Sequence, residues 1–263
     1  MKILFLGDIV GKPARKIIKE QLGSLRKELD AGCVIANGEN AAGGSSITLD
    51  TAQELFDCGI DVLTSGDHIF KKREAREALS RFDILRPLNY GPDAPGRGFL
   101  IKKIQGYRIG VLNLLGRVFL PPMDNPFQAV ARVLPEVRKN TDILIVDMHA
   151  EATSEKLAMG YYLAGKATAV IGTHTHIPTA DERIIKDHTA YITDAGMTGS
   201  FNSVLGREKE AIIEHFVSNL PVRFTVAQND VRIQGVLIDA DPRTGSASRI
   251  CRIEKKRNGT EPV

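Results

Sequence analysis

The chain has 263 residues, 43% of them hydrophobic and 25% charged, which is typical of a globular protein with a well-buried core. A net charge of +3 is too small to indicate nucleic-acid binding, and three widely separated cysteines without Cys-x-x-Cys spacing argue against structural zinc or a disulfide framework. No apolar run approaches the ~20 residues of a membrane span, and the N-terminus lacks a signal-peptide pattern, so we expect a cytoplasmic protein without membrane partners.

Short apolar segments alternate with amphipathic segments through most of the chain. This alternation predicts an α/β fold with a mostly parallel sheet. The predicted strands are KILFLG (2–7), CVIAN (33–37), DVLTSG (61–66), DILIVDM (142–148), AVIGT (169–173) and AYIT (190–193).

Helical spacing of apolar residues predicts the elements between these strands. Pro13 is expected to open the first helix, which carries apolar residues from Ile17 to Leu29. Further helices are predicted over 49–58, 73–82, 126–139, 155–164 and 207–218.

The remaining strands are predicted to be antiparallel. Gln105 and Gly106 should turn a hairpin within 98–116, and alternation after Pro221 predicts a meander of three strands, 222–228, 231–241 and 247–256. Without repeats or linkers, we expect a single domain over 1–263, with a frayed tail from about residue 258.

Side chains with metal-binding chemistry follow five of the predicted strands. A lone buried histidine is usually a hydrogen-bonded core or loop residue, but five strands ending in this way indicate a common site. The carboxyl ends of parallel strands meet along one edge of a sheet, where open α/β proteins bind ligands. Four of the six histidines fall there, and His188 and His215 do not. The candidate residues are Asp8, Glu39, Asn40, Asp67, His68, His149, His174 and His176.

This donor set exceeds the needs of one ion, so we predict a dinuclear site with its ions ~3.5–4 Å apart. His174 and His176 are expected on an extended segment, pointing to one side, so that each can bind a different ion. Nitrogen and oxygen donors without thiolate fit transition metals, with iron as the first expectation and manganese, zinc or cobalt as alternatives.

Seven sequence blocks between residue 1 and about residue 206 carry a resemblance to a known group of proteins: GDIVGKPAR, NGENAAGG, RPLNY, NLLGRVF, HAEATSEK, IGTHTHIPTAD and TDAGMTG. In these blocks the chain resembles the calcineurin-like metallophosphoesterase superfamily, and more narrowly its bacterial YmdB-like branch of 2′,3′-cyclic-nucleotide 2′-phosphodiesterases. The resemblance implies a sandwich of two β-sheets flanked by helices in four layers (αββα), with both metals at the strand ends.

The resemblance also implies a role for each candidate residue. His68 is the implied catalytic residue, and Glu39 is the implied bridge between the two ions. Two departures from the superfamily pattern stand out: Ile9 and Val10 follow Asp8 where a histidine ligand is usual, and Asp67 stands where an asparagine is expected. The implied ligands are Asp8, Glu39, Asn40 and His176 for one ion, and Glu39, Asp67, His149 and His174 for the other.

The implied activity is hydrolysis of small phosphodiesters, above all 2′,3′-cyclic nucleotides. A metal-bridging hydroxide would attack phosphorus in line with the leaving oxygen, to which His68 would donate a proton. The residues alone leave two alternatives open: a phosphomonoesterase or nuclease with the same metals, and a low-turnover regulatory protein that binds nucleotide or RNA. The expected partner is a small phosphodiester or nucleotide, and a homo-oligomer stays open.

Overall fold

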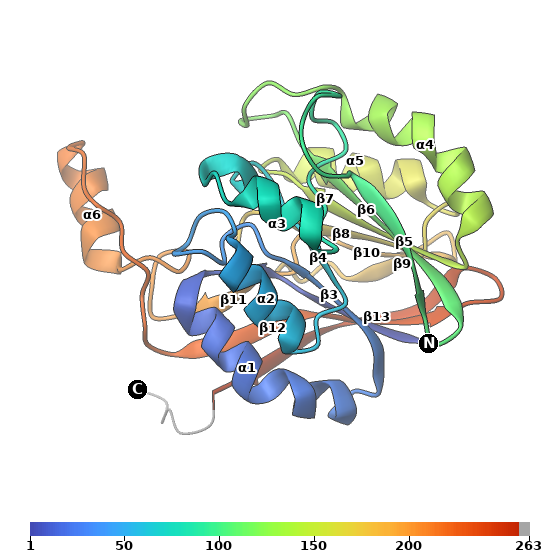
Figure 1. Ribbon diagram of the computed structural model, residues 1–263, viewed down its shortest axis with the longest axis horizontal. Helices are drawn as coiled ribbons and strands as arrows, with labels where there is room; N and C mark the ends of the chain where they lie inside the picture. The colour runs from blue at the N-terminus through green and yellow to red at the C-terminus, as the bar shows by residue number, and fades with distance from the viewer. Residues whose placement is uncertain (258–263) are drawn as a thin grey trace.

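A computed structural model describes residues 1–257, and the predicted frayed tail lies outside this range. Two β-sheets pack face to face, and helices cover their outer faces (Figure 1). The predicted four-layer sandwich is therefore confirmed. Within the described residues, no helix combines the length and the apolar character that crossing a bilayer requires.

The first sheet has seven strands in the order β2-β11-β12-β1-β3-β4, with β13 paired to β12. Strands β1, β3 and β4 run parallel, whereas β12 is antiparallel to both β1 and β13. The strands are β1 (Lys2–Leu6), β2 (Asp8–Ile9), β3 (Ala31–Asn37), β4 (Val62–Thr64), β11 (Met197–Ser200), β12 (Val231–Asp241) and β13 (Ser246–Lys256).

The second sheet has six strands in the order β5-β6-β7-β8-β10-β9. Its four inner strands are parallel, and the hairpin of β5 and β6 forms one edge. The strands are β5 (Phe99–Ile104), β6 (Tyr107–Leu115), β7 (Ile143–His149), β8 (Ala169–Thr173), β9 (Arg183–Ile185) and β10 (Thr189–Ile192).

Five α-helices cover the sheets, and a sixth projects away from them (Figure 1). Helices α1 (Gly11–Glu28), α2 (Leu49–Asp57) and α3 (Ala75–Arg81) pack on the first sheet. Helices α4 (Pro126–Asn140) and α5 (Thr153–Leu163) pack on the second sheet, and a short 3-10 helix, η1, spans Ile69–Lys71. Helix α6 (Lys209–Ser218) has no buried residue.

Alternation along the strands divides the apolar side chains between two cores. In β1, Leu4 and Leu6 contact the helices, whereas Ile3 and Phe5 contact the second sheet. All four side chains are fully buried. Burial on both faces explains why the parallel strands are almost continuously apolar.

One predicted strand is wrong. Residues 222–228 alternate in polarity as a strand does, but they form the return from α6, and only an isolated bridge between Val226 and Arg207 pairs them. We call residues 204–227 the arm. Because α6 carries this segment away from the sheet, no neighbouring strand pairs with it, and the meander is reduced to the β12–β13 hairpin.

Candidate metal centre

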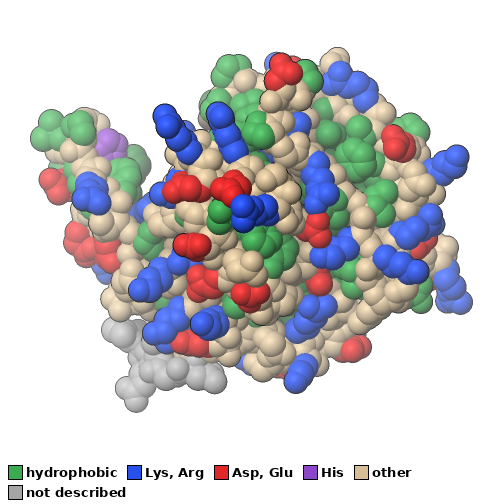
Figure 2. Space-filling model, viewed as in Figure 1, with side chains coloured by type: hydrophobic (Ala, Val, Ile, Leu, Met, Phe, Trp, Pro, Cys, Tyr) green, Lys and Arg blue, Asp and Glu red, His purple; other side chains and the backbone are tan. Residues whose placement is uncertain are grey.

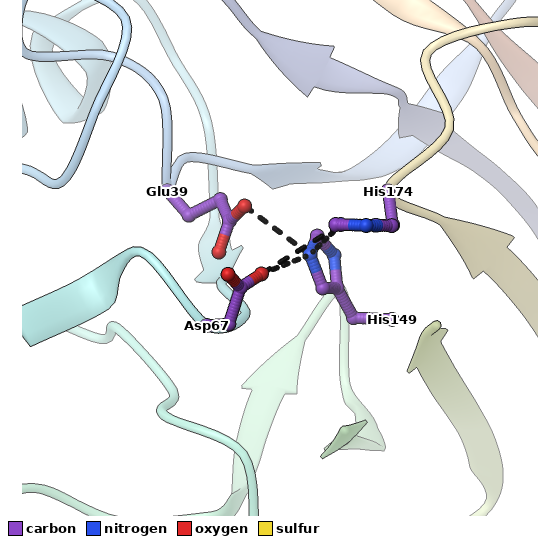
Figure 3. Close-up of side chains that lie close together, drawn as sticks. All are labelled: Glu39, Asp67, His149 and His174. Atoms are coloured by element: carbon purple, nitrogen blue, oxygen red, sulfur yellow. Dashed lines mark hydrogen bonds and ion pairs between the residues drawn. The ribbon is translucent and has the colours of Figure 1, made fainter. Parts of the chain in front are cut away.

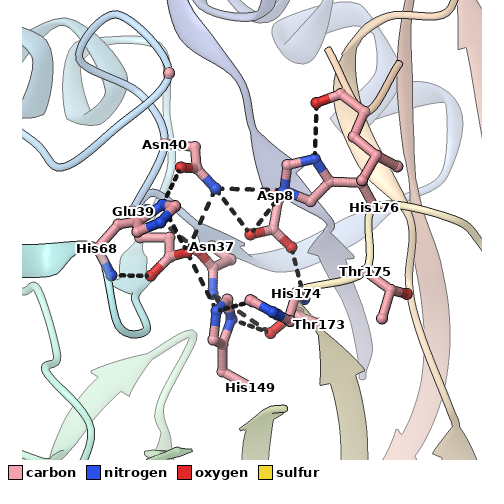
Figure 4. A network of polar contacts seen from close by, with 12 residues as sticks. Asp8, Asn37, Glu39, Asn40, His68, His149, Thr173, His174, Thr175 and His176 are labelled. Carbon is pink, nitrogen blue, oxygen red and sulfur yellow. Dashed lines mark hydrogen bonds and ion pairs between the residues drawn. The ribbon is translucent and has the colours of Figure 1, made fainter. Parts of the chain in front are cut away.

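All eight candidate residues lie at the edge of the sandwich where the parallel strands end (Figures 3 and 4). The strands belong to the two sheets of the predicted sandwich, so the candidate residues do not lie along the edge of a single parallel sheet. Asp8 and the residues after β3 and β4 come from the first sheet, whereas His149 and the residues after β8 come from the second. The site therefore joins the two halves of the sandwich.

Four candidate side chains form the tightest group (Figure 3). One donor atom from each of Glu39, Asp67, His149 and His174 lies within 4.8 Å of the others. His149 Nε2 lies 3.2 Å from Glu39 Oε1 and 3.0 Å from His174 Nδ1. Glu39 and His149 are almost completely buried, so these donors converge in a region shielded from bulk water.

A second group adjoins the first through Glu39. Asn40 Nδ2 lies 3.4 Å from Glu39 Oε1, 3.5 Å from Asp8 Oδ1 and 3.3 Å from His176 Nε2. The amide NH₂ group thus lies among two carboxylates and an imidazole, which are groups that would also bind a cation. Ligation through Asn40 Oδ1 requires a half-turn of the amide, whose nitrogen and oxygen ends are nearly isosteric.

Two further observations test whether these residues fit metal ions. Asp67 Oδ1 is buried and accepts no hydrogen bond from residues 1–257, although it lies 3.5 Å from His149 Nε2 and 3.6 Å from His174 Nδ1. A buried carboxylate oxygen without a donor is costly unless a cation satisfies it. A Cβ on Gly66 would collide with the His149 ring and the Glu39 carboxylate, so the absence of a side chain there admits the cluster. The donor set fits metal ions.

The carboxylates and imidazoles of the site stabilise each other's charged forms. Burial opposes ionisation of Asp8 and Asp67, yet neighbouring imidazoles hold the pKa of each carboxyl well below its ordinary value. Burial also opposes protonation of His149 and His176, but Glu39 and Asp8 raise the pKa of His149, and Asp8 raises the pKa of His176. Protons on these imidazoles therefore compete with metal for the same lone pairs.

A buried network orients the His149 ring. Thr173 Oγ1 donates its hydroxyl proton to Asp147 Oδ1 at 2.7 Å, so it accepts from His149 Nδ1–H at 2.8 Å. With the proton on Nδ1, the lone pair of Nε2 points into the cluster. Asp147 Oδ2 accepts from Thr64 Oγ1 at 2.5 Å and from Asn37 Nδ2 at 3.1 Å. Burial raises the pKa of Asp147 to about 6.

The segment that carries the last two histidines is not extended, contrary to the prediction. His174 and His176 have φ values of 102° and 64°, in the left-handed region that non-glycine residues rarely adopt. Asp194 Oδ2 accepts from Thr175 N at 3.0 Å and from Thr175 Oγ1 at 2.8 Å, and these bonds hold the turn. The turn still directs both imidazoles inward (Figure 4).

His68 is more exposed to solvent than the other three histidines of the site. Its side chain is 35% exposed, and its Nδ1 lies 2.8 Å from Asn40 Oδ1. Since a carbonyl oxygen can only accept, Nδ1 carries the proton in this contact. His68 N donates to Glu39 Oε2 at 3.0 Å, which fixes the start of η1 beside the cluster.

Several residues that support the site were not predicted. Glu151 Oε2 lies 3.1 Å from His174 Nε2 and holds that ring from the side opposite the cluster. Asp147 and Lys156 are charged residues with no exposed surface. Asp147 could have been recognised as a supporting residue because it is a charged residue within the apolar strand DILIVDM. Charged side chains are rarely fully buried without a partner. Thr173 offered no such signal.

Known proteins are similar to this chain over nearly its whole length. Residues 4–253 match the family model described as YmdB-like protein. The chain belongs to this family. It is also 45% identical, over 254 residues that cover 96% of each chain, to a Bacillus subtilis (strain 168) protein named 2′,3′-cyclic-nucleotide 2′-phosphodiesterase. The predicted family is therefore confirmed. The B. subtilis relative of this YmdB-like chain is named as an enzyme.

Two solved structures share the fold of this YmdB-like chain. A hypothetical protein from Thermus thermophilus is 36% identical with a TM-score of 0.92, and the match covers 97% of this chain and 99% of the other. A novel phosphatase from Mycoplasma pneumoniae is 34% identical with a TM-score of 0.91, and the match covers 97% and 93%.

Proposed function

We propose that the chain is a metal-dependent phosphodiesterase that opens 2′,3′-cyclic nucleotides at the 2′ oxygen and leaves a 3′-monophosphate. The observation that carries this proposal is the convergence of three carboxylates, an amide and three imidazoles beside the partly exposed His68. The named activity of the B. subtilis relative supports the cyclic substrate.

The donor atoms support two ions, with Glu39 between them. We assign Asp8, Glu39, Asn40 and His176 to one ion, and Glu39, Asp67, His149 and His174 to the other. Iron is our first expectation, with manganese, zinc or cobalt as alternatives. When bound, such ions lower the pKa of water and offset the charge of a phosphodiester.

The chain's own residues supply position and protons. Glu39 and His149 are held rigidly by burial and hydrogen bonds, so the donors need little rearrangement when substrate arrives. With Asn40 turned for ligation, its NH₂ group would donate to His68 Nδ1, so His68 would carry its exchangeable proton on Nε2. We assign to His68 the delivery of a proton to the departing 2′ oxygen, a role that typically contributes ~10²–10⁴-fold to a rate.

A second candidate is a phosphomonoesterase or nuclease with the same metals, which the name of the M. pneumoniae relative favours. A regulatory protein that binds nucleotide or RNA with little turnover would not need a proton donor, so His68 counts against it. The natural partner in our proposal is a small phosphodiester, and the cytoplasmic location and the homo-oligomer stay predictions.

A substrate panel tests the proposal. Protein purified without chelator is assayed for bound metal and for hydrolysis of 2′,3′-cyclic AMP, 3′,5′-cyclic AMP, bis-p-nitrophenyl phosphate and p-nitrophenyl phosphate. We expect about two metal equivalents per chain and the highest kcat/KM with 2′,3′-cyclic AMP, with adenosine 3′-monophosphate as product. Fast hydrolysis of p-nitrophenyl phosphate alone would favour the phosphomonoesterase, and metal-free inactive protein would contradict both enzyme candidates.

A further inference from the structure

The arm is fixed at its base rather than loosely attached. Glu208 N donates to Thr225 O at 3.0 Å, and Ala227 N donates to Gly206 O at 3.0 Å, so the two limbs pair where they leave the sandwich. Beyond this base, α6 projects from the body (Figure 1). Figure 2 shows hydrophobic side chains on its outer part. Near the end of α6, Phe216 and Val217 are 74% and 80% exposed.

The base of the arm also contacts the metal centre. His176 Nδ1 lies 3.1 Å from Leu205 O, and the Arg207 guanidinium donates to Gly43 O and Gly44 O of the loop that follows Glu39 and Asn40. A Cβ on Gly206 would press on Val10, so this part of the arm packs closely against the chain after Asp8. The arm therefore holds its side chains at a set position relative to the candidate ligands.

One cavity joins the arm to the metal centre. It has a volume of about 380 Å³, within the range of small-molecule binding sites. Its polar wall includes Glu39, Asn40, His68, Glu151, His174 and His176. Its apolar wall is formed by Val10, Val204, Leu205, Ile212 and Phe216.

The apolar wall offers no free charge to a ligand. Ile212 and Phe216 are four residues apart on α6 and therefore share one face of the helix. The charged side chain on this side, Arg207, turns its guanidinium to backbone carbonyls. Phosphate chemistry belongs to the polar wall, so the organic part of a substrate must occupy the rest of the cavity.

We propose that this apolar wall is a nucleobase subsite in which Phe216 stacks on the base and Leu205 and Ile212 line its edge. The proposal rests on the proposed function, because a cyclic nucleotide with phosphorus at the polar wall extends its ribose and base across the cavity. Aromatic stacking is nearly independent of base identity, since every base has a π-face. The subsite therefore accepts adenine, guanine, cytosine and uracil with similar affinity.

The test compares a substrate with a base and one without it: 2′,3′-cyclic AMP and ribose 2′,3′-cyclic phosphate. Phe216→Ala is the test variant. Val217→Ala is the matched control, because Val217 is an exposed apolar residue of the same helix that does not line the cavity. The measured ratio is kcat/KM for 2′,3′-cyclic AMP divided by kcat/KM for ribose 2′,3′-cyclic phosphate. We expect Phe216→Ala to lower this ratio about tenfold, because KM for 2′,3′-cyclic AMP rises. Val217→Ala should leave the ratio unchanged.

The other outcomes are distinct. If Phe216→Ala lowers kcat/KM equally for both substrates, or if light scattering shows that it changes the oligomeric state while the ratio is preserved, the arm serves folding or assembly and the subsite is wrong. If the wild-type protein hydrolyses neither substrate, the proposed function fails. The subsite is then judged by titration with adenosine: weaker binding to Phe216→Ala than to Val217→Ala supports it, and equal binding overturns it.

Discussion

Lys156 Nζ donates to Asp194 Oδ2 at 2.7 Å, and neither side chain is exposed to solvent. The same carboxylate oxygen accepts from the backbone and hydroxyl of Thr175, between the two histidines of the left-handed turn. The ion pair thus connects α5 to the turn that carries His174 and His176. Desolvation largely offsets the attraction within a buried charge pair. The main effect of this pair is therefore to fix the position of the turn.

Lys156→Met should lower the free energy of unfolding by about 3–5 kcal/mol, since it leaves the Asp194 carboxylate buried without a countercharge. It should also weaken metal binding, because the turn loses its anchor. Urea denaturation and metal analysis measure the two effects, with Lys139→Met, an exposed lysine on α4, as the control. An unfolding free energy within about 1 kcal/mol of wild type together with full metal content would show that the ion pair does not hold the turn.

His68→Ala should retain both metals and lose turnover by ~10²–10⁴-fold, because the side chain acts on substrate rather than on the ions. Metal content by mass spectrometry and kcat for 2′,3′-cyclic AMP give the two readouts. His188→Ala, a histidine outside the cluster, should match wild type in both. Loss of one metal equivalent in His68→Ala would make His68 a ligand and contradict our assignment.

Glu39→Gln should reduce metal content more than any single histidine substitution. Glu39 is the carboxylate whose oxygen lies close both to His149 and to the Asn40 amide, so it alone belongs to both groups of donors. We expect His176→Ala to keep close to one equivalent and Glu39→Gln to keep less. Two tightly bound equivalents in Glu39→Gln would place the bridge elsewhere.

As pH rises, the free energy of unfolding of the wild-type apoprotein should fall relative to that of the Asp147→Asn apoprotein. The pKa of Asp147 is raised to about 6 by burial from an ordinary 3.8, so the folded state holds this proton more tightly than the unfolded state. Its stabilising contribution is full below pH 3.8 and is lost as pH rises through about 6. Between about pH 4.5 and 7.5 the difference in unfolding free energy should move about 2 kcal/mol in favour of Asp147→Asn. A difference independent of pH would contradict the raised pKa.

Much of the fold could be predicted because its periodic segments are long and strongly apolar. Among residues 1–257, the six α-helices form within about two residues of the predicted ends, and in α1 to α5 the apolar stripe is the face that packs on a sheet. The short strands β2 and β11 were missed because each depends on the other: Met197 pairs with Asp8 across almost the whole chain. No local pattern specifies such a partner.

The convergence of the candidate ligands was predictable for a different reason. Carboxylates and imidazoles at strand ends are visible in the sequence, and strand ends converge by topology. The residues that orient them are not visible in this way. Thr173 reaches His149 because the two are register partners in β7 and β8, and the register of two strands depends on packing that one sequence does not specify. The left-handed turn at His174 and His176 likewise depends on Asp194, which comes from a later segment.

Asp67→Asn should increase the affinity for inorganic phosphate about tenfold without loss of the fold. The neighbouring imidazoles hold the pKa of Asp67 well below its ordinary value, so this carboxylate is ionised at neutral pH and repels an anionic ligand. Removing one unit charge several ångströms from a phosphate changes the binding free energy by an amount on the order of 1 kcal/mol or more. The neutral amide keeps the shape of the side chain, and it should also favour divalent over trivalent metal, because the charges nearest an ion dominate its electrostatics.

Competitive inhibition by phosphate is measured with the same metal loaded into both proteins, and Asp93→Asn, which removes an exposed carboxylate, controls for net charge. Equal inhibition constants for Asp67→Asn and wild type would show that Asp67 does not set the charge that the substrate meets.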